Sequence, residues 1–390
     1  MNESIALRVV AGARAAEAYL IREGYRGYDP YDALLSPLFR LPVLRSTVAR
    51  RLAQQALRRL PVNVRPLLMI KKGYNPVTLA LALQAYAYLS VADPPRAPLY
   101  RERAASCIAE LELLRARGYS GSCWGYDFDW EALGASMPAG TPTIVATGFV
   151  THALFTAHQL LRTERALSLL LNATEFVRRD IPRRIERSGC FSWSYSPVDR
   201  TTVINATAKG ARLCAEGYAL TADPELLELA TGGVTFVTQQ QRANGSWPYA
   251  VGDRRTWADN FHTGYVLECV ADYERHTGDS SFAGSLERGW RYYRDHFFTT
   301  DSIPKYRDDR AYPIDATAVA QSILTMCTFG DYATAERIAL FALERMQRRD
   351  GAFIYQRNRL YSNRITYVRW SVAWMFCAFA RLLCAESGQH

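Results

Sequence analysis

Two neighbouring stretches decide the fold: Asn244-Gly245-Ser246-Trp247-Pro248-Tyr249 and, ten residues later, Asp259-Asn260-Phe261-His262-Thr263-Gly264-Tyr265. The first is a glycine–aromatic turn. The second is a polar helix start, because Asp and Asn are favoured N-cap residues. The same pattern, a glycine–aromatic turn followed by a polar helix start, recurs along the chain. Further turns lie at residues 121–126, 189–193 and 350–353, and helices are predicted to open at Asn75, Pro142, Asn205, Asn260, Asp315 and Tyr367, about 52 to 67 residues apart.

Six helical hairpins at a loose period predict an all-α fold, a closed α/α toroid. The whole chain, 1–390, is expected to form one domain, because no linker-like composition divides it. Segment 1–75 would close the ring and 76–386 would supply the repeated hairpins. Helices are predicted at 5–22, 43–59, 76–91, 98–117, 142–162, 164–180, 203–221, 224–242, 259–277, 280–297, 315–328, 332–348 and 367–386, and strand signals are scarce.

The charge of the chain is strongly positive and almost all of it is arginine. The formal net charge is +9, and only Lys71, Lys72, Lys209 and Lys305 are lysines. Guanidinium groups match carboxylate and phosphate geometry, so anionic ligands fit this composition, as does a GC-rich genome. Nucleic acid is disfavoured because no basic arm or recognition motif is present. The arginines of the predicted helix 43–59 are expected to form a solvated face.

The expected location and metal content of the protein rest on sequence signals that are absent. Charged residues interrupt the stretch Met1–Leu20, which excludes a signal peptide, and no run of about 18 apolar residues predicts a membrane span. The eight cysteines have neither disulfide-framework nor zinc-ligand spacing. We therefore expect a reduced cytoplasmic protein without a metal or other cofactor. Peripheral membrane association and the oligomeric state stay open.

In an α/α ring the inner helices are parallel, so their N-termini and the turns before them gather on one rim. Helix N-termini favour anionic groups, which makes this rim the predicted ligand funnel. Its mouth is expected to be formed by the loops of Trp124, Trp193, Trp247 and Tyr355. The candidate substrate-binding residues are Trp124, Trp130, Tyr195, Trp247, Tyr249, Trp257, Asn260, Asp315, Tyr355, Tyr367, Arg369 and Trp370.

His262 is the strongest catalytic candidate, because it lies in the first turn of a predicted inner helix, beside Asp259. A histidine there can transfer a proton near neutral pH, with Tyr126 or Tyr265 as its counterpart. If Asp259 caps the helix, it should stay ionised and orient the histidine. The structural alternative is that Asp259 only caps and His262 only packs. His152 and His158 lie deeper in their helix, where a structural role is favoured.

Asp127 and Asp129 form a second catalytic candidate. They lie two residues apart in an aromatic loop, and paired carboxylates are what glycoside hydrolysis needs. The structural alternative is local Asx hydrogen bonding. We predict that one of them lines the same cleft as His262 and Asp259. Near the last inner helix, Arg364 and Arg369 are the cationic candidates, of which one could hold an acidic sugar while the other is solvated.

The segment Gln239 to Trp247 resembles the glutamine–tryptophan repeat of squalene–hopene cyclase and the terpenoid-cyclase and protein-prenyltransferase toroids, and Gln347 to Phe353 is a degenerate copy. Class II cyclases use an Asp-x-Asp-Asp acid, whereas this chain has Trp130 after Asp129. The whole chain looks similar to a bacterial family found with cell-surface polysaccharide biosynthesis genes, through Gly27–Asp32, Pro61–Pro66, Trp124–Trp130 and Asp259–Tyr265. Some members carry a delta-aminolevulinic acid dehydratase label, which implies a TIM barrel and Schiff-base lysine foreign to this helical pattern.

The resemblance implies a glycan or glycan-lipid substrate from a capsule, exopolysaccharide or lipopolysaccharide. We therefore expect a carbohydrate-active enzyme that uses acid/base chemistry for epimerisation, elimination or hydrolysis, on a glycan for which uronic acids are one candidate component. The alternative is a non-catalytic glycan- or isoprenoid-binding partner of a glycosyltransferase or export complex. A remoter alternative is a terpenoid-cyclase-like enzyme, which would need a deep apolar cavity ending in a protonated Asp.

Overall fold

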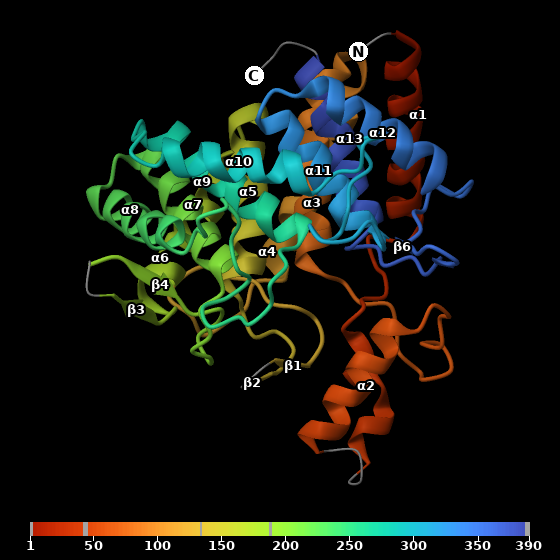
Figure 1. The fold of residues 1–390 in the computed structure, drawn as a ribbon, viewed down its shortest axis with the longest axis horizontal. Coiled ribbons are helices and arrows are strands. Elements are labelled where there is room, and N and C mark those ends of the chain that lie inside the picture. Colours follow the sequence, from red (N-terminus) through yellow and green to blue (C-terminus); the bar gives the residue numbers. More distant parts are fainter. Residues whose placement is uncertain (1–2, 42–45, 133–134, 187–188, 387–390) are drawn as a thin grey trace.

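The computed structural model describes residues 3–41, 46–132, 135–186 and 189–386, and these are mostly α-helical (Figure 1). Six inner helices contact one another in a closed cycle that follows chain order, with the last helix packed on the first. They are α3 (Pro76–Ala92), α5 (Ile144–Leu161), α7 (Ile204–Thr221), α9 (Asn260–Thr277), α11 (Ala316–Thr328) and α13 (Val372–Glu386). The predicted all-α toroid is confirmed.

Outer helices cover the inner ring. They are α4 (Ala97–Leu113), α6 (Glu164–Arg179), α8 (Pro224–Gln239), α10 (Ala283–His296), α12 (Tyr332–Arg345) and α1 (Glu3–Arg22). Although α1 comes first in the chain, it packs on α12 and α13 and so supplies the outer partner where the ring closes. By contrast, α2 (Thr47–Arg59) packs on the 3₁₀ helix η1 (Asp32–Leu35) and projects from the ring (Figure 1).

The strands of the described residues are short and lie in the connecting loops. An antiparallel pair joins β1 (Trp130–Ala132) to β2 (Ala135–Met137), and another joins β3 (Arg183–Ile185) to β4 (Phe191–Trp193). A third sheet has the order β5 (Ile314–Asp315), β6 (Gln356–Arg357) and β7 (Ser362–Asn363). Further short 3₁₀ helices are η2 (Pro37–Arg40) and η4 (Pro94–Arg96).

Side-chain caps fix the starts of four inner helices. The side chains of Asn75, Thr143, Asp259 and Asp315 accept hydrogen bonds from backbone N–H groups in the first turns of α3, α5, α9 and α11. Each cap satisfies donors that the helix itself leaves unpaired. The caps therefore place the first turns, and the side chains on them, at one rim of the ring.

The repeated tryptophans hold the hairpins together. The indole N–H groups of Trp124, Trp193 and Trp247 donate to the carbonyls of Leu111, Val177 and Val237, at 2.7, 3.0 and 2.9 Å. Each of these carbonyls lies near the C-terminal end of the preceding outer helix. Because the three rings are at most 4% exposed, the repeat serves mainly to pack the hairpins.

The first glycines of three of the repeated turns, Gly121, Gly245 and Gly351, press against an outer helix. A Cβ atom on Gly245 would lie 2.5 Å from the carbonyl oxygen of Arg288 in α10, and one on Gly351 would lie 2.1 Å from that of Ala15 in α1. Both glycines have positive φ, +93° and +87°, which suits glycine alone. Gly351 thus sits where the last hairpin meets α1.

Replacing Gly351 with alanine should therefore lower the free energy of unfolding by at least about 2 kcal/mol, because the change adds both backbone strain and a backbone overlap. Urea unfolding measures the loss. Gly330→Ala is the control, since Gly330 has a φ of +76° but no heavy atom within 4 Å of the added Cβ. Equal losses in the two variants would show that the contact with α1 is unimportant.

Within the described ranges, one helix, α5, is long and apolar enough to cross a membrane, and 72% of it is buried inside the structure. Its position explains this composition. An inner helix is surrounded by its ring neighbours and its outer helices, so it is apolar on all sides. The apolar character of α5 is accounted for by the toroid.

Candidate active site

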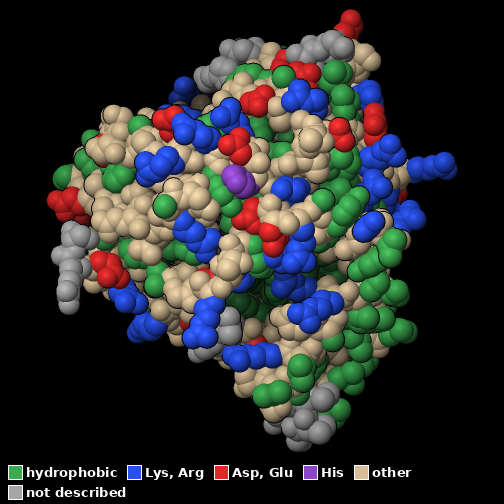
Figure 2. Space-filling model, in the orientation of Figure 1, with side chains coloured by type: hydrophobic (Ala, Val, Ile, Leu, Met, Phe, Trp, Pro, Cys, Tyr) green, Lys and Arg blue, Asp and Glu red, His purple; other side chains and the backbone are tan. Residues whose placement is uncertain are grey.

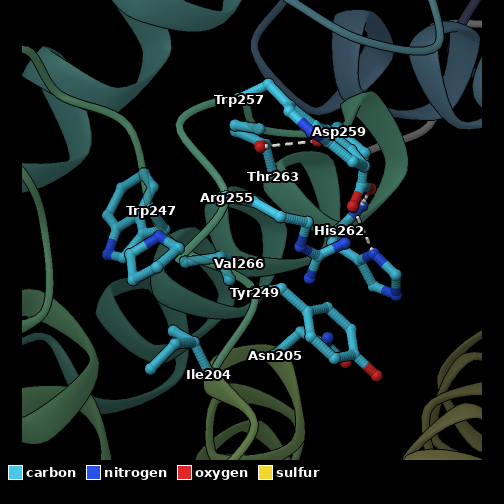
Figure 3. Close-up of a pocket in the computed structure, with 12 residues that line it drawn as sticks. Ile204, Asn205, Trp247, Tyr249, Arg255, Trp257, Asp259, His262, Thr263 and Val266 are labelled. Atoms are coloured by element: carbon cyan, nitrogen blue, oxygen red, sulfur yellow. Dashed lines mark hydrogen bonds and ion pairs between the residues drawn. The ribbon is translucent and has the colours of Figure 1, made fainter. Parts of the chain in front are cut away.

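The caps and turns bring an open pocket of about 310 Å³ to the rim where α7 and α9 begin (Figure 3). Its lining includes Asn205, Tyr249, Arg255, Trp257, Asp259 and His262. They come from the starts of two inner helices and from the loop between Trp247 and α9. The stretch that decides the fold thus also builds the pocket.

Asp259 and His262 form a hydrogen-bonded pair at the start of α9. One carboxylate oxygen of Asp259 accepts the backbone N–H of His262 at 2.9 Å, and the other lies 2.8 Å from Nδ1 of the His262 ring. A carboxylate only accepts hydrogen bonds, so Nδ1 is the donor and Nε2 keeps a free lone pair. The side chain of Asp259 is 5% exposed and that of His262 is 28% exposed. The pair has the arrangement of an oriented general base.

Aromatic rings surround His262. The ring of Tyr249 lies 4.9 Å from it, edge to face, and that of Tyr265 lies 5.7 Å away. Figure 3 shows the imidazole next to the Asp259 carboxylate and beside the ring of Tyr249. Burial raises the pKa of Tyr249 and that of Tyr265 above the usual tyrosine value. Both hydroxyls therefore stay protonated at neutral pH and can donate a proton or a hydrogen bond.

Guanidinium groups stack on the aromatic wall of this pocket. Arg255 lies over Tyr249 at 4.8 Å and over Trp257 at 4.9 Å, and Arg307 covers Trp257 at 3.8 Å. Asp253 accepts hydrogen bonds from Nε of Arg255 at 2.9 and 3.0 Å. Cation–π stacking holds such groups in place while their outer edges stay able to meet an anion.

Arg369 lines a second pocket, where its charge is already paired. Its Nε and a terminal nitrogen lie 2.7 and 2.6 Å from Oδ2 of Asp29, which also accepts the indole N–H of Trp370 at 3.2 Å. The guanidinium stacks on Tyr126 at 4.7 Å and on Trp370 at 4.5 Å. Of the two predicted cationic candidates, Arg369 is buried at the mouth and Arg364 is exposed. The pairing with Asp29 makes Arg369 a positioning group for the aromatic wall.

Arg58 is a further cationic residue near the site, and no sequence pattern identified it as a candidate. It was expected on the solvated face of helix 43–59, but its guanidinium lies over the Tyr31 ring at 4.9 Å, and Asp315, Tyr306 and Tyr355 lie within electrostatic reach. Among the described residues, no carboxylate forms a hydrogen bond or ion pair with it. The residue pattern of a helix indicates which side chains share a face, but it does not indicate which other elements pack against that face. The position of Arg58 could therefore not be predicted from the sequence.

Asp127 and Asp129 do not line the pocket of His262. Asp127 lines a second pocket, of about 300 Å³, with Asp29 and Arg369, and burial, followed by the nearby Asp29, raises its pKa. Asp129 accepts the backbone N–H of Ala139 at 2.8 Å and faces Arg50 at 3.4 Å, with its side chain 42% exposed. The predicted cleft shared with His262 and Asp259 does not form, because the loop after Trp124 folds toward residues 27–32 and α2.

Several predicted binding residues have structural positions. Trp124 is held in the repeat described above, and Trp247, although its ring is held there too, also lines the pocket. Asn260 is fully buried and bonds to Ser322 and Tyr293. Asp315 caps α11 and accepts the Gln356 amide, and burial raises its pKa to about 6. Tyr355 and Tyr367 pack edge to face at 4.8 Å.

Other predicted residues do gather at the mouth. Tyr126 and Tyr195 approach through their hydroxyl oxygens, 3.4 Å apart, and Trp130 packs edge to face on Tyr195 at 5.8 Å. Arg369 stacks on both Tyr126 and Trp370, and the ring of Trp370 lies 5.9 Å from that of Phe261 on α9. The mouth is thus a continuous band of partly buried rings. Such rings present flat apolar surfaces with polar edges, which suit a sugar ring.

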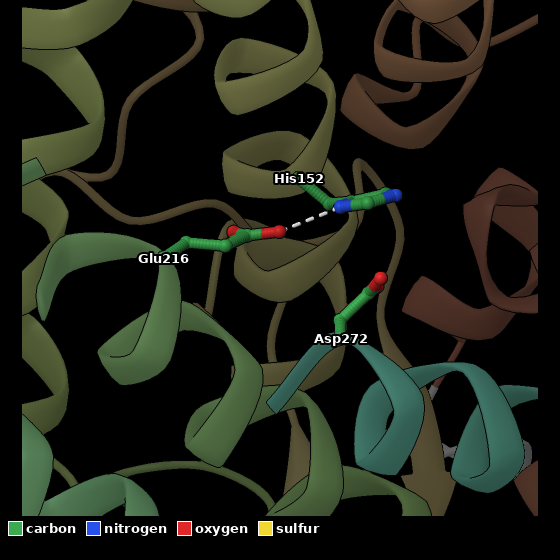
Figure 4. A group of neighbouring side chains, drawn as sticks. All are labelled: His152, Glu216 and Asp272. Carbon is green, nitrogen blue, oxygen red and sulfur yellow. Dashed lines mark hydrogen bonds and ion pairs between the residues drawn. The ribbon is translucent and has the colours of Figure 1, made fainter. Parts of the chain in front are cut away.

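His152 belongs to a separate polar cluster inside the ring. His152, Glu216 and Asp272 converge from α5, α7 and α9 (Figure 4), and their ligand atoms lie within 4.8 Å of one another. The Arg212 guanidinium lies 3.8 Å from Glu216 and 3.6 Å from Asp272, so a resident cation already faces both carboxylates. Burial lowers the pKa of His152 well below its usual value. These contacts fit an internal charge network, and His158 bonds to the carbonyl of Thr163.

Lys209 lies next to the ring of Tyr265, and no sequence pattern predicted this buried lysine. Its Nζ lies 3.5 Å from the ring centre of Phe149 and 4.3 Å from that of Tyr265, and the residue is 1% exposed. Burial, followed by the nearby Arg212, lowers the pKa of Lys209 to about 7. Because this folded-state pKa lies below the usual value, the unfolded chain binds more protons between about pH 7 and 10.5, and stability rises with pH there.

Lys209→Met should therefore remove a pH-dependent part of the stability. Between pH 7 and 9 the wild-type protein should gain about 2 kcal/mol relative to the variant. Urea unfolding at both pH values measures this difference, and Lys71→Met is the control because Lys71 is exposed. A difference that stays constant with pH would contradict the buried position of the amine.

Several solved structures with a similar fold are named as enzymes that act on sugars. Cellobiose 2-epimerase from Bacillus thermoamylovorans superposes with a TM-score of 0.63 at 10% identity, over 82% of this chain and 90% of that one. An unsaturated glucuronyl hydrolase specific for heparin gives 0.61 at 14% identity over 96% of each chain. A GH76 α-mannanase from Bacteroides thetaiotaomicron gives 0.57 at 12%, over 78% and 85%. At these identities the likeness establishes the fold alone.

No protein-family model matches the sequence, and no curated protein sequence is similar to it.

Proposed function

We propose that this protein is a carbohydrate-active enzyme that moves a proton at a carbon atom of an acidic sugar, with His262 as the base. The observation behind the proposal is the Asp259–His262 pair, whose free Nε2 belongs to a residue lining an aromatic pocket. An ionised carboxylate behind Nδ1 fixes the tautomer of the imidazole and stabilises the imidazolium that forms when Nε2 takes a proton.

The surroundings of the pair favour an anionic sugar as the substrate. Trp257 and Tyr249 offer ring faces, Arg255 is paired with Asp253, and Arg58 offers positive charge that no described carboxylate pairs. Structures of similar fold include sugar epimerases and a glucuronyl hydrolase by name, which supports a glycan substrate. Together with the sequence resemblance, this leads us to propose a uronic-acid-containing glycan of a bacterial surface polysaccharide.

The chemical step is then a proton transfer next to the sugar carboxylate. Nε2 of His262 removes the C5 proton, and the electron pair of the C–H bond moves into the carboxylate, where a guanidinium neutralises the added charge. If Tyr249 returns a proton from the opposite face, C5 is inverted, and His262 and Tyr249 regain their starting states by exchanging protons with solvent. If the electron pair instead forms a C4–C5 double bond, the bond from C4 to its oxygen breaks, that oxygen takes the proton of Tyr249, and the product is an unsaturated sugar. Hydrolysis is less favoured, because Asp127 and Asp129 lie outside this pocket.

Incubation of the purified protein with uronic-acid oligosaccharides in deuterated water tests the proposal. Epimerisation should place deuterium at C5, detected as a mass increase of one unit per turnover, and elimination should give a product that absorbs ultraviolet light. New reducing ends without deuterium would show hydrolysis and overturn the proton-transfer mechanism. Tight binding without any product would favour the alternative of a non-catalytic glycan-binding protein, for which the aromatic band at the mouth is also suited.

Arg58 should contribute mainly to binding of the substrate carboxylate. Arg58→Gln is expected to raise KM by about tenfold or more with a smaller change in kcat, because a charge-assisted hydrogen bond is worth about 1.5–3 kcal/mol. Initial rates across substrate concentrations measure this. Arg59→Gln is the matched control, since the neighbouring Arg59 is exposed. An unchanged KM for Arg58→Gln would remove Arg58 from the site.

A further inference from the structure

The positive charge of the chain is concentrated in one segment. Residues 33–72 contain nine Lys or Arg residues and no Asp or Glu. The whole chain has 47 basic and 38 acidic residues, so the rest of it, with 38 of each, is neutral. The net charge of +9 therefore belongs to the segment that contains α2.

The same segment also exposes an unusual amount of apolar surface. Of the eighteen large hydrophobic side chains that are exposed in the described residues, nine lie between Leu35 and Met69. Val48 and Leu52, one turn apart on α2, are 68% and 65% exposed, and Leu67 is 82% exposed. Figure 2 shows hydrophobic side chains spread over the projecting part of the molecule that holds α2 in Figure 1.

Apolar and basic groups alternate on this surface. Arg59 follows Val48 and Leu52 on the exposed side of α2, and Lys71 follows the exposed Met69. Leucine and valine side chains with arginine and lysine beside them, without acidic residues, are typical of helices that lie at a lipid interface. There the apolar groups enter the acyl boundary, while the long basic side chains reach the headgroups.

We propose that the surface of residues 33–41 and 46–72, here called the basic apolar surface, docks onto an anionic phospholipid bilayer. A second copy of the chain is a poor occupant, because two such surfaces would bring the exposed Arg59 and Lys71 of one copy against the same cations of the other. An acidic protein would match the charge but would have to expose an equally apolar patch. A bilayer with anionic headgroups supplies both components at once.

The opposite side of α2 ties this surface to the mouth of the candidate site. Nε of Arg50 lies 2.7 Å from Glu131 beside the Trp130 loop, and Arg58 reaches over Tyr31. A membrane that contacts the exposed side of α2 would therefore lie next to the mouth. Docking would hold the site near glycans that are linked to lipids, although the docking itself does not depend on the proposed reaction.

Co-sedimentation of the full chain with vesicles tests the proposal. The wild-type protein should bind vesicles that contain phosphatidylglycerol much more tightly than vesicles of phosphatidylcholine, and added salt should weaken this binding. Arg59→Gln with Lys71→Gln should lower the affinity about 30-fold, because each basic residue near an anionic surface contributes about a factor of five. Equal binding to both vesicle types, or to neither, would overturn the proposal.

The apolar contribution is tested with a matched pair. Leu52→Ser should lower vesicle affinity at least about fivefold, whereas Leu7→Ser should have no effect. Leu7 is 64% exposed, almost the same as Leu52, but it lies on α1 and outside the basic apolar surface. Circular dichroism checks that both variants stay folded. Equal losses in the two variants, or a dimer in solution that Leu52→Ser dissociates, would show that lipid is not the occupant.

Discussion

Replacing His262 with alanine is expected to lower kcat for the proton transfer by about 10²- to 10⁴-fold, the usual contribution of a general base. The fold should survive, because His262 is partly exposed and the cap on α9 is made by Asp259 through the backbone N–H of residue 262. Deuterium incorporation into the substrate measures the loss, and the melting temperature checks the fold. A stable variant with full activity would refute the catalytic role.

The Asp259→Asn variant distinguishes two roles of Asp259, the orientation of the His262 imidazole and the N-capping of α9. Asparagine is as good an N-cap as aspartate, so stability should change little. The amide cannot stabilise an imidazolium, and its NH₂ group can bind the other tautomer, so kcat should still fall by about 10²-fold or more. If Asp259→Asn unfolds the protein but His262→Ala does not affect activity, the pair is a structural cap only.

Asp29→Ala is expected to lower the free energy of unfolding by about 3–5 kcal/mol, the cost of leaving a buried charge without its partner. Asp29 is 6% exposed and Arg369 is 8% exposed, and the same carboxylate accepts hydrogen bonds from Trp370 and the backbone N–H of Tyr31. Urea unfolding at neutral pH measures the loss.

The double variant Asp29→Ala/Arg369→Met distinguishes the charge from the packing. It removes both charges but keeps an apolar stem against Tyr126, so it should recover part of the stability that Asp29→Ala loses. A loss below about 1 kcal/mol in Asp29→Ala, or no recovery in the double variant, would mean that the ion pair does not hold this wall of the mouth.

The sequence predicted the toroid well because its signals are local. The Asp259 cap lies within the stretch that forms the start of α9, and the observed helix, Asn260–Thr277, differs by one residue from the predicted 259–277. The last inner helix was less accurate: it was predicted from Tyr367 but begins at Val372, because residues 367–371 form turns that place Arg369 and Trp370 at the mouth. Repetition of such local signals is enough to indicate a ring.

The site was harder to predict because its contacts are distant in sequence. Asp29 and Arg369 are 340 residues apart, and no local pattern pairs them. The direction of Trp124 depends on where α4 ends, so its ring was expected at the mouth but lies in the core. His262 and Asp259 could be paired from sequence because helix geometry brings residues three apart together. Sequence reasoning therefore found the local pair and missed Arg58, Asp29 and Lys209.

The position of α1 also has a consequence for how the protein is made. Its buried side, with Val9, Ala13 and Leu20, is covered by α12 and α13, which a ribosome would complete roughly 350 residues later. At about 5–20 residues per second, α1 would wait for roughly 20–70 s before its partners exist. Unlike an open solenoid, whose repeats can fold one after another as they emerge, this ring can finish folding only after translation has reached α13. We therefore expect nascent chains truncated before α13 to bind chaperones through α1 and to be sensitive to protease there.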